Sequence, residues 1–209
     1  MKARVRGRVS DGRARGAVGF LRRRPRLRRW VYDVQRARCA EMLARVAGTL
    51  GDGPFLDLGA GTCNTTELLR ERGLEATALD VVDQSFIEGI TPVLYDGRDL
   101  PFPDDAFETA LIFTVLHHAV DPDRVLAEAR RVARRVIVIE DVVRGRLHGA
   151  TTKAWDSVMN LEFKGHPHSN RTDDGWLRAF ADAGLQLVER QECWSALVMW
   201  QVTYVLERA

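Results

Sequence analysis

A short apolar run that ends in a glycine turn constrains the fold of this chain more than any other feature. Residues 55–58 are apolar apart from Asp57, and Gly59 and Gly61 follow at once. Residues 64–72 then have the composition of a helix, which Gly73 ends. Glycines let a backbone turn tightly and approach a ligand closely, and a new helix presents free N–H groups. The pattern therefore predicts a buried strand, a turn and a helix, with which α/β proteins hold nucleotide-like cofactors.

Segments typical of strands and helices alternate along the rest of the chain. The predicted helices cover residues 30–50, 63–72, 121–134 and 172–184. The predicted strands cover residues 55–58, 76–79, 93–95, 109–115, 136–139, 185–188 and 197–206. Alternation of this kind implies an α/β fold with a mostly parallel sheet and helices on both faces. The last two strands are close in sequence and are expected to form an antiparallel hairpin.

The charge of the chain is divided unevenly along its length. Residues 1–30 contain 12 of the 31 Lys and Arg residues and one of the 29 acidic residues, a balance of +11. The remaining 19 basic and 28 acidic residues give the rest of the chain a charge of −9. We therefore expect a basic flexible arm over residues 1–29 and one α/β domain over residues 30–209. The arm is either a contact for acidic membrane, nucleic acid or substrate, or simply a solvated tail, which is the commoner case.

Composition also predicts the compartment. No apolar run approaches the ~20 residues that a membrane-spanning helix needs, and no signal peptide is evident. The three cysteines, Cys39, Cys63 and Cys193, are far apart and form no metal-ligand pattern. An odd number of isolated cysteines fits a reducing compartment, so a cytoplasmic location is expected.

The spacing within the glycine turn distinguishes between cofactors. A dinucleotide fingerprint has glycine or alanine at the sixth position from its first glycine, and here that position is Asn64. The turn instead resembles motif I of the class I S-adenosylmethionine (SAM) methyltransferases, acidic-x-G-x-G-x-G. Asp57, Gly59 and Gly61 match this motif, and Cys63 replaces its last glycine.

Two further segments resemble methyltransferases of the ubiquinone and menaquinone biosynthesis type. Residues 95–108, YDGRDLPFPDDAFE, follow that family's "D-A-x-x-L-P-F-x-D-x-x-F-D" pattern, to which dehydrogenases have no counterpart. Residues 114–122, TVLHHAVDP, contain the "L-H-H" stretch that precedes a helix in the same family. The resemblance covers residues 53–140 strongly and implies a Rossmann-like sheet of seven strands that binds SAM.

The resemblance also assigns roles to individual residues. Asp57 would hold the amino group of the methionine part of SAM, and the glycine turn would line that part. Asp80 ends the second predicted strand, where an acidic side chain can accept both hydroxyls of a ribose. Asp96 and Gly97 would recognise the adenine, Val81 would pack on its face, and Thr114 would close the floor beneath the sulfonium. The predicted cofactor-binding residues are Asp57, Gly59, Ala60, Gly61, Asp80, Val81, Asp96, Gly97 and Thr114.

Acid–base candidates follow the fourth and fifth predicted strands. His117 and His118 are the first choices for a general base, since the pKa of histidine lies near neutrality. Asp141 and His166 follow in preference, and at least one of the two adjacent histidines is expected to have a structural role. Residues 141–171 are interpreted as a substrate lid. His166, His168 and Asp141 could form a metal site, but a lid without metal is preferred because H-x-H is a weak signal.

The sequence thus predicts a SAM-dependent methyltransferase with a small-molecule acceptor that it does not identify. One alternative is a nicotinamide-dependent oxidoreductase, against which Asn64 and residues 96–107 argue. Another is a nonenzymatic SAM-binding protein whose basic arm contacts nucleic acid.

Overall fold

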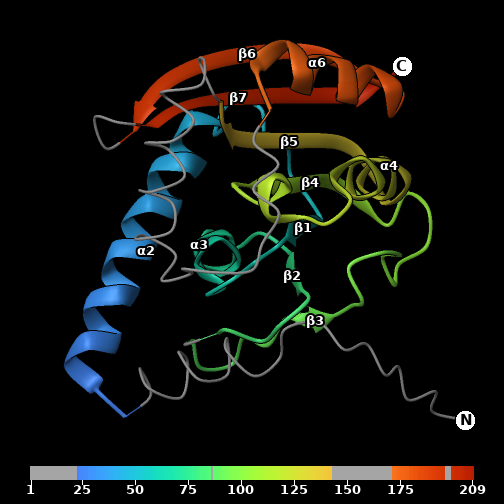
Figure 1. The fold of residues 1–209 in the computed structure, drawn as a ribbon. Helices are drawn as coiled ribbons and strands as arrows, with labels where there is room; N and C mark the ends of the chain where they lie inside the picture. The colour runs from blue at the N-terminus through green and yellow to red at the C-terminus, as the bar shows by residue number, and fades with distance from the viewer. Residues whose placement is uncertain (1–22, 86, 143–170, 196–198) are drawn as a thin grey trace, which may run out of the picture. The chain divides into compact units, whose positions relative to one another are not determined.

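The computed structural model describes residues 23–85, 87–142, 171–195 and 199–209 (Figure 1). They belong to two compact units, which divide between Pro101 and Phe102. The predicted lid and its His166 lie almost wholly outside the described residues, as do residues 1–22 of the predicted arm. No helix in the described ranges is both long and apolar enough to cross a membrane.

The first unit contains a small parallel sheet with two helices. Strand β1 (Phe55–Leu58) pairs in parallel with β2 (Ala76–Asp80), and β2 pairs in parallel with β3 (Val93–Leu94). All four residues of β1 are buried, which explains its near-continuous apolar sequence. Helix α3 (Asn64–Glu71) follows the glycine turn, and α2 (Pro25–Arg45) packs against it. The contact side of α2 is apolar near its C-terminal end, where Met42 and Leu43 are buried.

The second unit contains four strands in the order β4-β5-β7-β6. Strands β4 (Phe107–Phe113) and β5 (Ala133–Asp141) are parallel, whereas β7 (Met199–Arg208) runs antiparallel to both β5 and β6 (Leu185–Ser195). The 3₁₀ turn η1 (Leu116–His118) and helix α4 (Pro122–Val132) connect β4 to β5. Helix α6 (Asp173–Asp182) precedes β6.

Side chains at the starts of α4 and α6 fix where these helices begin. Asp121 accepts a hydrogen bond from the Arg124 N–H, and Pro122 occupies the first turn. Thr172 accepts one from the Gly175 N–H. Both residues are N-caps, because their short polar side chains satisfy unpaired amides of a first turn.

The predicted fold class is confirmed. The sheet has seven strands and is mostly parallel, with an antiparallel C-terminal hairpin. Several boundaries differ from the expectation: α2 ends at Arg45 and not at residue 50, β4 lies two residues earlier than predicted, and β5 is longer than the predicted 136–139. Helix α2 begins at Pro25 instead of Trp30, so that residues 25–29 of the predicted arm are helical. Strand β6 continues through the polar residues 189–192, which the pattern could not identify because this edge strand is exposed beyond Leu185.

Candidate functional site

The turn between β1 and α3 is held against the end of β2 by backbone hydrogen bonds. The amides of Gly59 and Ala60 both donate to the carbonyl of Leu79, over 2.8 and 3.0 Å. Gly59 and Gly61 have φ angles of +76° and +51°. This left-handed region is accessible to glycine at no steric cost, which explains why the turn needs glycine at these two positions.

Asp57 is a buried carboxylate that holds the start of α3. Its Oδ2 accepts hydrogen bonds from the Thr66 amide at 3.1 Å and from the Thr66 hydroxyl at 2.7 Å. Burial, with a smaller contribution from the negative charge of Asp80, raises the pKa of this carboxyl to about 6 against the opposing effect of the hydrogen bonds from Thr66. Asp57 is therefore a poorly solvated acid that gains from a nearby cation.

Asp80, at the end of β2, fastens the glycine turn from the other side. Its Oδ2 accepts from the Gly61 amide at 2.7 Å, and its Oδ1 accepts from the amides of Val81 and Val82 at 2.6 and 3.2 Å. Burial raises the pKa of Asp80, and these three amides oppose the shift. Each carboxylate oxygen has two acceptor sites, so Oδ2 keeps one for a further donor such as a ribose hydroxyl.

Cys63 occupies the position of the missing third glycine in a left-handed conformation. Its φ and ψ are 64° and 19°, and it is the residue directly before α3. Its side chain is fully buried in a cluster with Ala78 and Ile90. Burial raises the pKa of its thiol to about 12. The side chain is thus a small apolar filler whose thiol stays protonated near neutral pH.

We expect Cys63→Gly to change the free energy of unfolding by no more than about 1 kcal/mol. Relief of the left-handed strain offsets the packing lost with the side chain, each being about 1 kcal/mol. Urea unfolding measures the change. Cys63→Val is the contrasting variant: a branched side chain at this φ should cost more than about 2 kcal/mol. Equal stability of the two variants would contradict the strained conformation.

Two observations on the turn test whether it suits a bound cofactor. A Cβ added to Gly61 would meet no atom within 4 Å, so the backbone there borders open space. Asn64 is 1% exposed, and its Nδ2 has no hydrogen-bond acceptor among the described residues, although its Oδ1 accepts from the Thr62 hydroxyl at 2.6 Å. A buried amide donor without an acceptor is costly, so a ligand oxygen at this turn would be favourable. Both observations fit a cofactor with a carboxylate.

A second part of the predicted cofactor site lies after β2 and β3. Val81 is 43% exposed and lies next to Gly97, whose added Cβ would be 3.6 Å from Val81 Cγ1. Asp96 is exposed, and its Oδ1 accepts from the Arg98 amide at 3.0 Å. Gly97 has a φ of +81°, which keeps this position free of a side chain. An exposed apolar side chain beside a bare backbone and a carboxylate provides a surface suited to a flat, polar-edged ring.

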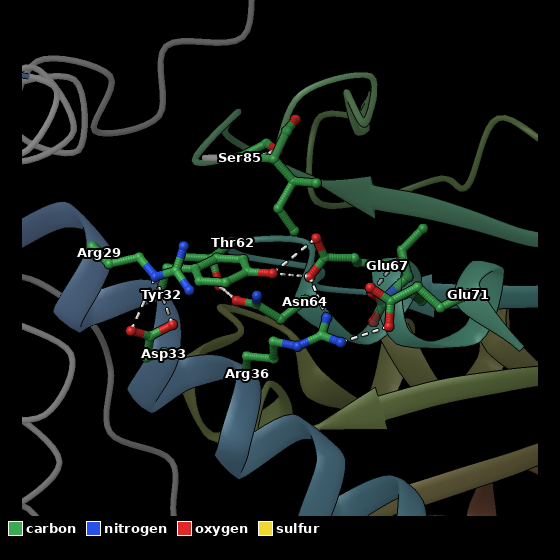
Figure 2. Close-up of polar contacts among 12 residues, drawn as sticks. Arg29, Tyr32, Asp33, Arg36, Thr62, Asn64, Glu67, Glu71 and Ser85 are labelled. Carbon is green, nitrogen blue, oxygen red and sulfur yellow. Dashed lines mark hydrogen bonds and ion pairs between the residues drawn. The ribbon is translucent and has the colours of Figure 1, made fainter. Parts of the chain in front are cut away.

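Helix α2 is fastened to the start of α3 by a polar cluster of Tyr32, Arg36, Glu67 and Glu71 (Figure 2). The Tyr32 hydroxyl donates to both oxygens of Glu67 at 2.8 and 3.0 Å. The guanidinium of Arg36 bridges Glu67 at 2.7 Å and Glu71 at 2.5 Å. Glu67 lies in the first turn of α3, so this cluster brings α2 to the start of that helix. The sequence did not indicate it, because the partners are more than 30 positions apart.

In the second unit, the residues after β4 adopt a strained turn around a buried glutamate. Thr114 has a φ of +56°, which is rare for a β-branched residue. Glu140, fully buried near the end of β5, accepts from the amides of Val115 and Leu116 at 2.9 and 2.6 Å. Its other oxygen lies 2.6 Å from Nδ1 of the fully buried His117. Glu140 therefore fixes the backbone of η1 and orients the ring of His117, which has no exposed surface.

The remaining acid–base candidates differ in accessibility. The ring of His118 stacks at a tilt on that of His117, with centroids 4.0 Å apart, and it is only partly buried. Asp141 is 1% exposed, and its Oδ1 accepts from Gln201 Nε2 at 3.0 Å. His118 is thus the better placed of the two histidines to meet a substrate. No group of three His, Cys, Asp or Glu residues that could hold a metal occurs in the ranges that the structure describes.

Comparisons with known proteins agree with this geometry. Residues 56–136 match the family model described as a methyltransferase domain. Demethylmenaquinone methyltransferase of Thermobifida fusca is 32% identical over 99 residues, which cover 41% of this chain and 42% of the relative. Phosphatidylethanolamine N-methyltransferase of Cereibacter sphaeroides is 26% identical over 181 residues, 78% of this chain and 87% of the relative. The chain spans only 23% to 35% of the length of the first curated relatives that it matches.

Solved structures share the fold at low sequence identity. Magnesium protoporphyrin IX methyltransferase of Synechocystis, with bound SAH, has a TM-score of 0.61 and 14% identity over 84% of each chain. As the sequence resemblance predicted, residues 56–136 match a methyltransferase family model, and the Rossmann-like fold is shared with solved methyltransferase structures.

Proposed function

We propose that the protein is a methyltransferase that binds SAM at the β1–α3 turn and transfers its methyl group to a small-molecule acceptor. The observation that carries this proposal is the pair of buried carboxylates, Asp57 and Asp80, on either side of the glycine turn. Their mutual repulsion contributes to the raised pKa of Asp57. SAM brings an amino group and a sulfonium, both cationic, whereas a nicotinamide dinucleotide would bring an anionic pyrophosphate. The acidic turn therefore favours SAM over the oxidoreductase cofactor.

Individual residues of the first unit fit the parts of SAM. Asp57 Oδ1 has no donor among the described residues and is available to the methionine amino group. Asn64 Nδ2, which has no acceptor among the described residues, would supply a donor for the methionine carboxylate. Asp80 Oδ2 retains an acceptor site for a ribose hydroxyl. For the adenine, Val81 provides an apolar contact, while Asp96 and Gly97 provide a carboxylate and a backbone N–H.

The chemical step places modest demands on the protein. Bound SAM supplies a methyl group that is already activated by the positive sulfur. The protein then has to exclude water and orient the acceptor. Thr114, in its strained turn, is assigned to the floor of this site. His118 is assigned as the base for an acceptor that must lose a proton, with His117 held in place by Glu140. Asp141 and His166 remain lesser candidates.

Transfer of a radiolabelled methyl group from SAM tests the proposed activity. Phosphatidylethanolamine and demethylmenaquinone should be tried first, since two relatives are named for them. Label should appear in an acceptor, and Asp80→Asn should reduce the transfer because the new side chain would point an NH₂ donor at backbone N–H groups. SAM binding without transfer to any acceptor in a broad metabolite panel would favour a nonenzymatic SAM-binding protein. Hydride transfer with NADH would favour the oxidoreductase.

A further inference from the structure

The N-terminal end of α2 is an exposed surface that the proposed function does not use. All residues from Arg23 to Trp30 are exposed, and in Figure 1 this blue end of α2 extends beyond α3. The segment RRPRLRRW contains five arginines and no acidic residue. Two apolar side chains interrupt the arginines: Leu27 is 36% exposed and Trp30 is 62% exposed.

Helical geometry places Arg26, Leu27 and Trp30 on one side of the helix. Trp30 is four positions after Arg26 and three after Leu27, so the three side chains are neighbours on the surface of α2. Arg23, Arg26 and Arg28 have no ion pair with any described residue, whereas Arg29 pairs with Asp33 at 3.0 Å. The result is a cationic surface with an apolar and an aromatic side chain exposed at its centre.

We propose that this surface of α2, formed by Arg26, Leu27 and Trp30 together with the preceding Arg23, docks on a membrane that contains anionic phospholipids. Arginines at a helix surface are attracted to acidic headgroups, and tryptophan prefers the boundary between headgroups and acyl chains. Leu27 favours a membrane over a nucleic acid, because an aliphatic side chain gains from the acyl boundary but offers a polynucleotide neither a charge nor a stacking ring. The preceding 22 residues add seven basic residues against one acidic residue. This inference does not depend on methyl transfer.

Sedimentation of the full chain with lipid vesicles tests the docking surface. The protein should bind vesicles of phosphatidylcholine mixed with phosphatidylglycerol, and it should not bind phosphatidylcholine alone. Binding should weaken as salt is added, because the headgroup attraction is screened. Arg26→Glu should weaken binding by about tenfold or more, since each basic residue contributes about a factor of five and the change reverses one charge. Trp30→Ala should also weaken vesicle binding, and the size of this loss should depend little on the salt concentration.

Two matched variants control for general effects of charge and of aromatic loss. Arg178→Glu reverses an exposed arginine on α6, and Trp194→Ala removes another exposed tryptophan. Neither should change vesicle binding, and thermal melting should show that all four variants fold. The proposal is overturned if the wild-type protein ignores anionic vesicles or if the control variants lose binding equally. It is also overturned if Trp30→Ala binds vesicles as well as wild type does while deletion of residues 2–22 abolishes vesicle binding. A third contradicting result would be that duplex DNA or RNA binds through α2 and vesicles do not.

Discussion

Asp57→Asn should make the cofactor-free protein more stable at pH 8 while weakening its affinity for SAM. The folded-state pKa of Asp57, about 6, lies above its ordinary value of 3.8 because the carboxyl is buried. A buried acid of this kind costs stability once it ionises, so its penalty is absent below about pH 4 and complete above about pH 6. The difference between the two pKa values corresponds to roughly 3 kcal/mol of unfolding free energy. This is the upper limit for the stabilisation that the neutral asparagine can give.

The affinity for SAM should show the opposite trend. A cationic amino group favours the ionised Asp57, so wild-type affinity should rise as pH increases through about 6 and then level off. Asp57→Asn should bind more weakly and lose this pH dependence. Urea unfolding and SAM titration between pH 4 and pH 8 measure both effects. The exposed Asp52→Asn is the control and should change neither. A wild-type affinity that does not vary with pH would contradict the role of Asp57.

Glu140→Ala should destabilise the protein by about 3–5 kcal/mol, the range for removing one partner of a buried charged network. The change leaves the buried amide of Leu116 and the ring of His117 without their acceptor, and it also removes the acceptor of the Val115 amide. Glu140→Gln should cost less, because its remaining oxygen still accepts from the two amides. Its NH₂ group would face His117 Nδ1, which should move the imidazole proton to Nε2 and alter the pH profile of methyl transfer.

Urea unfolding of Glu140→Ala should be compared with that of Glu207→Ala. Glu207 also lies on a strand and pairs with an arginine, Arg135, but its side chain is 45% exposed. Exposed ion pairs contribute only about 0–1 kcal/mol, so the control should be nearly as stable as wild type. A loss below about 1 kcal/mol for Glu140→Ala would show that Glu140 does not organise η1.

The sequence predicted the parts of the fold that depend on local patterns. The glycine turn, the starts of the helices near residues 121 and 172, and the alternation of strands and helices each have a signal within about ten residues. The strand ends were less predictable. Strand β6 continues through a polar segment that has no strand pattern of its own, because that segment pairs with β7. The start of α2 was missed because its arginines resemble a solvated tail, although Pro25 is a typical first helical residue.

Contacts distant in sequence explain what was missed at the site. His117 was the first choice as a base, but Glu140, 23 positions later, holds it in a fully buried position. A carboxylate directly after the apolar run of residues 136–139 was the one available signal for this pair. The raised pKa of Asp57 likewise depends on the burial of β1 and on Asp80, which a motif does not describe. The roles of the individual cofactor residues stay predictions.

Calorimetric titration of SAM and of NADH into wild type, Gly61→Ala and Gly73→Ala tests the central claim most directly. Both glycines have a positive φ and open space around an added Cβ, so each variant places an alanine in a left-handed conformation without a clash among the described residues. Only Gly61 lies in the turn between β1 and α3. Wild type and Gly73→Ala should bind SAM with micromolar affinity, Gly61→Ala should bind at least tenfold more weakly, and NADH should not bind. Equal SAM affinity in the two variants, or NADH binding in place of SAM, would contradict a SAM site at this turn.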